Sequence, residues 1–351
     1  MPIQQMLLGV GGASTKVQDL FSADIYDGSG SARSIDNGID LSGEGGMVWI
    51  KARTVAYNHF LGDTARGSSK GFCPDLDQAE FTESQGFTSF NSNGFSLGTS
   101  ASVNSSSHDF VAWTFRKHPK FFDIQTATVG ADDSTYATGI THQLESDVGL
   151  AIFKSRNNTT QGVNWLIWHH ETTDANNEYY RFDDYGIRTS NNTLTYNSSN
   201  KTFTFGYPAQ HTGDRMRPGT GAASNVVGYF FADNNNDGEF GSAGNEDIIK
   251  VGHYYGNGNS TGTAVNLGFE PQYVLLRQNG RSPYTDWFVF DSARGVTAGS
   301  ADKLLRPNTS GAETSSDYIK FTSTGFQLET DSSDVNKFNN IYMYVAIRKD
   351  Q

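Results

Sequence analysis

Cysteine is almost absent from this chain of 351 residues, in which Cys73 stands alone. A single cysteine excludes an internal disulfide and a cysteine-based metal site. Free cysteine usually behaves as a small buried hydrophobe, so we expect Cys73 to be a small, half-buried side chain. A chain without a disulfide framework is typical of proteins that fold in a reducing cytosol.

Basic clusters and long hydrophobic runs are also missing. The chain has 26 Lys and Arg against 38 Asp and Glu, which gives a net charge of -12. The cations are scattered, and because nucleic-acid binding needs clustered positive charge, we expect no nucleic-acid partner. The opening stretch MPIQQMLLGVGGAS has no basic segment and only a short apolar run. It therefore predicts neither a signal peptide nor insertion into a membrane.

What the sequence has instead is many short strand-like runs. Aromatic residues make up 13% of the chain, which is too many for a disordered protein. Gly, Ser and Asn separate runs that are rich in aromatic and β-branched residues, and no segment shows a long helical period. These features predict an all-β fold.

One pattern occurs three times. A Gly-rich hairpin leads into four apolar residues and a cation, and each copy ends in a further apolar strand. The first runs are MVWIK (47–51), LAIFK (150–154) and YVLLR (273–277), and the closing runs are 110–117, 225–232 and 341–349. We expect each first run to be a buried strand with its cation, Lys51, Lys154 or Arg277, at a solvated end.

The repeat predicts three tandem β-sandwich-like modules of roughly 100 residues, the size of a compact sandwich. The expected divisions are an N-terminal arm (1–20), module 1 (21–119), a divergent module 2 (120–232), an Asn/Asp/Gly-rich linker (233–248) and module 3 (249–351). The matching stretches FNSNGFSLG and FTSTGFQLE place Gly94 and Gly325 in turns that we expect to need positive φ.

Two copies of one pentapeptide occupy equivalent places in modules 1 and 3. They are DTARG, with Asp63 and Arg66, and DSARG, with Asp291 and Arg294. An Asp three residues before an Arg can close a turn, because the carboxylate accepts from backbone N–H groups and pairs with the guanidinium. We interpret both copies as structural turns. The middle module has WHHETT instead.

Aromatic residues are densest in the middle module, interleaved with Asn and Asp. Such rings and polar groups can hold sugars, which makes this cluster a candidate contact for a host surface glycan. The candidate residues are Trp168, His170, Tyr179, Tyr180 and Tyr185. The alternative is a sandwich core, and a metal site at the histidines is disfavoured because strand neighbours point to opposite faces.

The stretch DNNNDGEFG resembles the first half of a calcium loop, with oxygen ligands at alternate positions. The candidate ligands are Asp233, Asn235, Asp237 and Glu239, and Glu246 and Asp247 could complete such a site. The acidic residue expected at the twelfth position is absent, so this is no EF-hand. The sequence leaves open a calcium site of another kind and a simple polar linker.

Catalytic motifs are not found in the sequence. It contains no Ser-His-Asp signature, no phosphate-binding loop and no dinucleotide fingerprint. Paired carboxylates for glycoside hydrolysis could come from acids of the middle module, namely Glu171, Asp174, Glu178, Asp183 and Asp184. Among 38 acids some cluster is inevitable, so we expect a protein that is not an enzyme.

The sequence resembles repeat proteins encoded by tailed phages, especially marine and cyanobacterial ones. The stretches that carry the resemblance are MPIQQMLLGV, GGMVWIKAR, SFNSNGFSLGTSASVN, VAWTFRK, GYFFADNNNDGEFG, EDIIKVGHYYGNGNSTGTAVNLGFEPQYVLLR and DSARG. The resemblance covers nearly the whole chain and implies a structural protein of the virion, commonly a tail fibre or tail-associated protein. The middle module departs from the family pattern at WHHETT.

The resemblance sets the remaining expectations. In a virion protein the N-terminal arm is expected to bind other virion proteins, with Met6, Leu7, Leu8 and Val10 buried against the partner. We expect synthesis in the host cytoplasm, a place in the tail, and a homotrimer by analogy with fibres. The alternatives are an adaptor or capsid decoration protein without a receptor, and a polysaccharide depolymerase, which is disfavoured because no long β-helix period is visible.

Overall fold

The chain folds into antiparallel sheets, so the predicted all-β fold is confirmed. The computed structural model describes residues 15–129, 139–157, 164–171, 178–182, 187–189, 194–205, 216, 224–241, 243–279, 286–296 and 302–350. Within these ranges the helices are short, and none could cross a lipid bilayer.

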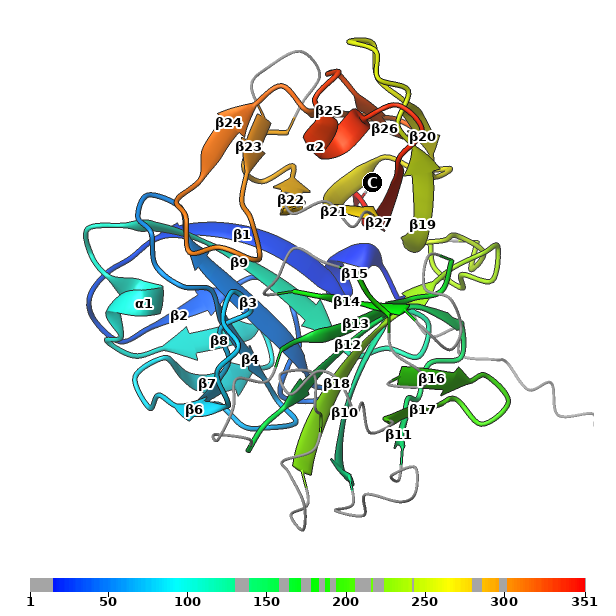
Figure 1. Cartoon of the computed structure of the whole chain (residues 1–351). Helices are drawn as coiled ribbons and strands as arrows, with labels where there is room; N and C mark the ends of the chain where they lie inside the picture. Colours follow the sequence, from blue (N-terminus) through cyan, green and yellow to red (C-terminus); the bar gives the residue numbers. More distant parts are fainter. Residues whose placement is uncertain are drawn as a thin grey trace, which may run out of the picture.

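Module 1, blue to cyan in Figure 1, is a two-layer sandwich. A four-stranded sheet of order β1-β9-β3-β4 packs against a three-stranded sheet of order β2-β8-β7, with the pair β5-β6 beside them. The elements are η1 (Val17–Asp19), β1 (Phe21–Asp27), β2 (Arg33–Asp36), β3 (Gly46–Ala52), β4 (Phe60–Asp63), β5 (Lys70–Gly71), β6 (Phe81–Thr82), β7 (Phe87–Asn91), β8 (Gly94–Leu97), α1 (Ala101–Asn104) and β9 (Asp109–Arg116).

Module 2, green in Figure 1, has a corresponding large sheet that is extended by two strands. Its order is β10-β18-β12-β13-β14-β15, and a second sheet has the order β11-β17-β16. The elements are β10 (Phe122–Val129), β11 (Ile140–Thr141), β12 (Asp147–Ser155), β13 (Leu166–His169), β14 (Glu178–Arg181), β15 (Ile187–Thr189), β16 (Leu194–Asn197), β17 (Thr202–Phe205) and β18 (Ser224–Asp233).

Module 3, yellow to red in Figure 1, repeats the plan of module 1. Its sheets have the orders β19-β27-β21-β22, β20-β26-β25 and β23-β24. The elements are β19 (Ile249–Tyr255), β20 (Ala264–Asn266), β21 (Pro271–Asn279), β22 (Trp287–Asp291), β23 (Asp302–Leu304), β24 (Thr314–Ser316), β25 (Ile319–Thr322), β26 (Gly325–Leu328), α2 (Ser333–Asn336) and β27 (Ile341–Arg348).

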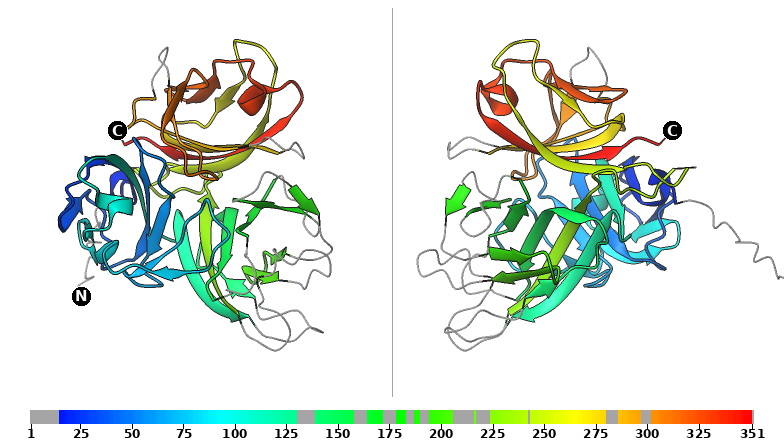
Figure 2. Two further views of the ribbon diagram at one scale, coloured as in Figure 1. Left: turned by 60° about the vertical axis from the view of Figure 1, so that its left-hand side comes forward. Right: turned by 90° about the vertical axis from the view of Figure 1, so that its right-hand side faces the viewer.

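Strand register shows which residues are equivalent in the three modules. The second strand pair of each large sheet aligns Met47 with Asp63, Leu150 with His169, and Tyr273 with Asp291. The modules are not arranged in a line. Their large sheets converge on a shared centre, and the three modules lie around it (Figures 1 and 2).

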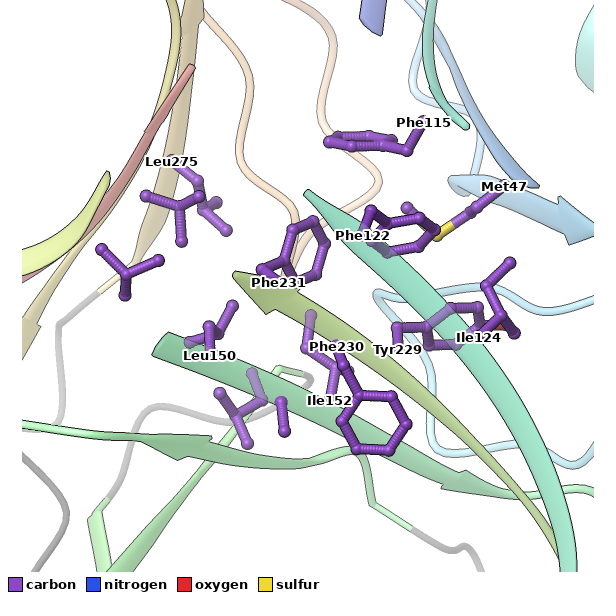
Figure 3. Close-up of a cluster of buried hydrophobic side chains, with 14 of the residues drawn as sticks. Met47, Phe115, Phe122, Ile124, Leu150, Ile152, Tyr229, Phe230, Phe231 and Leu275 are labelled. Atoms are coloured by element: carbon purple, nitrogen blue, oxygen red, sulfur yellow. The ribbon is translucent and has the colours of Figure 1, made fainter. Parts of the chain in front are cut away.

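The shared centre explains why the first apolar run of each module has no polar alternation. In β3, Met47 and Trp49 face the centre, whereas Val48 and Ile50 face the interior of module 1. Both faces of the strand are covered, so the four positions 47–50 are all apolar. Figure 3 shows side chains from all three modules meeting there, among them Met47 of β3, Tyr229 of β18 and Leu275 of β21.

The prediction of solvated cations at the ends of these strands was wrong. Lys51, Lys154 and Arg277 are fully buried. The ammonium of Lys51 donates to the carbonyl oxygen of Ala52 at 2.7 Å. The guanidinium of Arg277 donates to the carbonyl oxygen of Arg181 at 3.1 Å. Backbone carbonyls thus take the place of water around these cations.

The two matched glycines have different structural reasons. Gly94 has φ 128°, as predicted for a turn that favours glycine. Gly325 is not in the left-handed region, so that part of the prediction was wrong. What excludes a side chain is the facing strand, because a Cβ would lie 2.0 Å from the carbonyl oxygen of Ile35 at Gly94 and 1.9 Å from that of Val265 at Gly325.

The segments expected to stand outside the modules are partly packed. Val17 and Leu20, from the predicted arm, are buried in the shared centre. In the predicted linker, Phe240 is buried and its ring lies 5.1 Å from that of His118. Asn234 is also buried and accepts from the backbone N–H of Ile248 at 3.1 Å. The linker is therefore part of the packed body. 

Candidate functional site

The Asp63 turn closes on itself and also reaches into module 2. Asp63 Oδ1 accepts from the backbone N–H of Arg66 at 2.9 Å, and Oδ2 accepts from Arg66 Nε at 2.5 Å. Oδ2 also accepts from the hydroxyl of Tyr229, on β18 of module 2, at 2.7 Å. The side chains of Asp63 and Arg66 have no exposed surface. Burial raises the pKa of Tyr229 well above its ordinary value, against the opposing effect of the Arg66 charge, so Tyr229 keeps its proton.

The Asp291 turn repeats this geometry between modules 3 and 1. Asp291 accepts from the backbone N–H of Arg294 at 2.9 Å and from Arg294 Nε at 2.7 Å. Its third donor is Trp113 Nε1, on β9 of module 1, at 2.9 Å. Register places Trp113 and Tyr229 at the same position of their modules. Each turn therefore joins its own module to a neighbour through an equivalent donor.

Two glutamates extend both turns, and the sequence analysis missed them. Glu80 binds Arg66 at 3.3 Å within module 1 and Arg156 of module 2 at 2.9 Å. In the same way Glu313 binds Arg294 at 3.4 Å and Arg53 of module 1 at 2.9 Å. A signal was present, because Lys51-Ala52-Arg53 and Lys154-Ser155-Arg156 repeat a cation two residues after the buried one.

A third contact occurs in all three modules. Register makes His59, Trp165 and Trp287 equivalent, and each donates a ring N–H to a carbonyl oxygen of a neighbouring module. His59 donates to Arg306 at 3.0 Å, Trp165 to Leu76 at 3.1 Å and Cys73 at 3.3 Å, and Trp287 to Arg181 at 3.1 Å. Module 1 thus donates to module 3, module 3 to module 2, and module 2 to module 1. The contacts form a closed ring.

The proton on His59 can be assigned from its partners. Nδ1 accepts from Trp49 Nε1 at 2.9 Å, so Nε2 carries the hydrogen that binds the carbonyl oxygen of Arg306. Burial, together with the nearby charge of Lys51, lowers the pKa of His59 to about 3. The ring is therefore neutral at physiological pH and serves as a fixed structural donor.

The junction between modules 2 and 3 is built differently. His169 stands where Asp63 and Asp291 stand, and Val345 stands where Trp113 and Tyr229 stand. The acceptor and the donor have thus been replaced together. Burial holds the pKa of His169 well below its ordinary value, so the ring is neutral.

Two other histidines supply polar contacts at this junction. His253 Nδ1 lies 2.7 Å from Glu171 Oε2. His170 Nε2 lies 3.1 Å from the carbonyl oxygen of Val251 and 3.9 Å from Asp233 Oδ2. Space is tight as well, because a Cβ at Gly149 would lie 2.4 Å from the Cβ of Val251. This junction therefore depends on histidines where the other two use Asp–Arg turns.

The predicted glycan-binding cluster lies in the core. Trp168, Tyr179 and Tyr180 are 7%, 1% and 0% exposed, so their rings cannot stack on an external sugar, and this prediction was wrong for them. They pack there because both faces of the module 2 sheet are covered. His170 is half-buried and directed at Val251, and Tyr185 lies outside the described residues.

The four calcium candidates do not converge. Asp233 accepts from the backbone N–H of Val251 at 2.9 Å, which directs it toward module 3. Lys120 lies beside two of the others, 3.2 Å from Glu239 and 2.9 Å from the carbonyl oxygen of Asp237. Across the described ranges, no group of three or more His, Cys, Asp and Glu side chains is arranged to hold a metal ion. The Lys120 ammonium lies where a bound cation would, so the described contacts favour the polar linker, one of the two readings that the sequence left open.

The loop that contains these residues is held by its own contacts. Asp247 accepts from the backbone N–H groups of Asn236 and Gly238, both at 3.1 Å. Glu246 lies 3.2 Å from Arg348, and Asn235 is exposed. The remaining predicted residues, Met6, Leu7, Leu8 and Val10, lie outside the described residues.

The shared centre contains a small cavity of about 20 Å³, which is room for about one water molecule. Side chains from all three modules line it, including Trp49, Tyr229 and Leu275. Its walls are apolar, so the cavity is a packing gap and not a ligand site.

Comparison with known proteins gives one assignment. No curated protein matches the sequence. The family described as "Domain of unknown function (DUF7483)" matches residues 16–350. The match includes all three modules and both Asp–Arg turns, and the chain therefore belongs to this family.

Proposed function

We propose that this protein is a non-enzymatic structural component of a tailed-phage virion, namely a tail fibre or tail-associated protein that contacts the host surface. The resemblance of its motifs to tailed-phage repeat proteins supports the proposal. The observation that carries it is the use of the buried charged groups. The buried charged side chains of the two turns take part in contacts between modules, whereas a catalytic site would leave such groups available to a substrate. These residues are Asp63, Arg66, Asp291 and Arg294.

The ring of junctions supports the proposal, because a structural component of a particle needs a rigid body. Each module is joined to both others through buried hydrogen bonds. Buried hydrogen-bonded networks of this kind fix one arrangement, because an unpaired buried group is costly. We infer that the three modules move as one body and that host contact is made by loops on its outside.

The attachment to the particle is proposed for the N-terminal arm. Val17 and Leu20 are buried in the shared centre, which fixes the point where residues 1–14 join the body. Met6, Leu7, Leu8 and Val10 would then be buried against another virion protein.

The test combines incorporation with attachment. Phage carrying a tagged gene are purified, and the protein is sought in the particles by mass spectrometry. Deletion of residues 2–12 should leave a folded protein that is no longer incorporated. Purified protein should bind intact host cells. Absence of the tagged wild-type protein from purified particles would overturn the proposal.

A second candidate is an adaptor or capsid decoration protein without a receptor. The burial of Trp168, Tyr179 and Tyr180 favours it, because the residues first assigned to host contact are structural. Incorporation into particles without binding to cells would select this candidate. Release of reducing sugar from host polysaccharide would instead indicate a depolymerase.

A further inference from the structure

Module 1 contains a pocket. At the equivalent place in module 3, a side chain of module 3 occupies the space. The pocket has a volume of about 260 Å³ and is open to solvent. Tyr57, Phe60, Phe81, Cys73, Asn58 and Glu83 line it. A volume of this size suits a small chemical group and is below that of drug-sized sites.

The equivalent place in module 3 follows from the strand register. The bridges Leu61–Phe72 and Val289–Leu305 match, so Cys73 corresponds to Arg306. In the same register Phe60 corresponds to Phe288. The next equivalences are Asn58 with Asp286, Phe81 with Thr314, and Glu83 with Ser316.

Arg306 occupies this place in module 3. Its guanidinium lies 5.4 Å from the centre of the Phe288 ring. Its Nε lies 2.8 Å from a carboxylate oxygen of Asp286, and Nη1 donates to the Thr314 hydroxyl at 3.2 Å. A planar cation stacked on an aromatic face and paired with a carboxylate is a favourable arrangement.

Module 1 keeps the aromatic face and the carboxylate but lacks the cation. Cys73 brings no cation to this place, and because the Phe60 ring is only 3% exposed, the accessible ring is that of Phe81, at the position of Thr314. The carboxylate is Glu83 in module 1 and Asp286 in module 3. Glu83 Oε1 accepts from the backbone N–H of Gln85 at 2.8 Å. In the part of the chain that the structure describes, its Oε2 and the hydroxyl of Tyr57 have no hydrogen-bond partner.

The aromatic walls are held in place before any ligand arrives. The rings of Phe60 and Phe81 meet edge to face at 5.3 Å. Glycines behind them make this possible, because a Cβ at Gly71 would lie 2.7 Å from Phe81 and one at Gly86 would lie 2.7 Å from Phe60. A wall that is already ordered loses little entropy on binding.

We propose that this pocket binds a guanidinium group from outside the chain, packed against the half-buried ring of Phe81 and paired with Glu83. Uncharged acceptors at Tyr57 and Asn58 complete its hydrogen bonds. The net charge of -12 attracts cations to the protein. The proposal does not rest on the virion function, since the site exists in any setting of the protein.

Titration with agmatine, followed by NMR of the full chain, tests the site. Signals from the pocket should shift, and Glu83→Gln should weaken binding at least tenfold. Glu270→Gln, which removes an exposed acid paired with Lys349, is the matched control and should bind as wild type. Equal binding by Glu83→Gln, no shift with agmatine, or equal shifts with glucose would each overturn the proposal.

A second variant imitates module 3. Cys73→Arg places a guanidinium where Arg306 lies and should abolish agmatine binding. If it fails to fold, the Glu83→Gln result still decides. A short peptide with a central arginine distinguishes the two sources of the group. Tighter binding of the peptide than of agmatine would indicate a protein partner, and equal binding would indicate a free small molecule.

Discussion

The hydroxyl of Tyr229 donates to Asp63 across 2.7 Å, from the second module to the first. The acid is already paired with Arg66 of its own turn. The turn is thus both a local structure and the receiving half of a contact between modules. Trp113 and Asp291 repeat the relationship between the first module and the third.

Tyr229→Phe should destabilise the protein by about 1–3 kcal/mol, because it leaves a buried carboxylate oxygen with one donor fewer. Urea unfolding measures the change. Tyr57→Phe is the control, since no described residue binds its hydroxyl, and it should cost much less. Equal losses in the two variants would contradict the role given to Tyr229.

Arg53 and Glu313 should be energetically coupled. The pair joins modules 1 and 3 through two hydrogen bonds of 2.9 and 3.0 Å, and the Glu313 side chain is 8% exposed. A double-mutant cycle with Arg53→Ala and Glu313→Ala should give a coupling of about 0.5–3 kcal/mol. The exposed pair Lys349 and Glu270 should give less than about 1 kcal/mol. Similar values for both pairs would show that the Arg53 contact is incidental.

Acidification should weaken the junction between modules 2 and 3. Burial holds the pKa of His169 well below its ordinary value. In the unfolded chain His169 binds a proton near pH 6.5, whereas in the folded state it stays neutral at that pH. The free energy of unfolding therefore falls as the pH drops below that value. His59 and His142, whose pKa values burial lowers to about 3 and about 4, act in the same direction.

The measurement is the melting temperature at pH 7.5 and pH 5. His169→Asn, which cannot be protonated in this range, should lose less on acidification than the wild type. His108→Asn changes a histidine outside this junction and is the control. An unchanged pH dependence in His169→Asn would show that His169 does not cause the loss of stability on acidification.

Asp302 should have the opposite pH dependence. It is fully buried and accepts from the backbone N–H of Ile319 at 2.9 Å, and burial raises its pKa to about 7. The folded state prefers the protonated acid, so this contribution to stability is lost as the pH rises from about 4 through 7. Asp302→Asn should raise the melting temperature by about 2 °C or more at pH 8 and give no gain at pH 5. A gain that is the same at both values would exclude the ionisation as its cause.

The assembly expected from one chain is a monomer. A homotrimer of single modules would bury three equivalent head-to-tail interfaces, and here one chain already buries them. Light scattering after size exclusion should give the mass of one chain. A mass three times larger would instead support the homotrimer of whole chains expected from the fibre analogy.

Much of the fold could be predicted because its signals are local. Strand runs, Gly-rich hairpins and the repeated Asp-x-x-Arg-Gly turn depend on neighbours in sequence. The burial of three cations, Lys51, Lys154 and Arg277, could not be predicted from such local signals. Their carbonyl partners become available only when sheets pack together, and a cation at the end of an apolar run otherwise suggests solvent.

The candidate site was less predictable for a related reason. Trp168, Tyr179 and Tyr180 have the composition of a sugar site, and only the covering of both sheet faces makes them core. The pocket at Cys73 was invisible because it depends on an absent side chain. It becomes apparent only when Arg306 is seen in the corresponding place.

The three junctions belong to one polypeptide, and this has a genetic consequence. In an assembly of identical subunits, one codon change alters every interface at once, and all copies must tolerate it. Here His169 and Val345 differ from their counterparts while Asp63, Tyr229, Asp291 and Trp113 keep the paired form. A gene that encodes the whole ring can therefore change the chemistry of one boundary and leave the other two as they are.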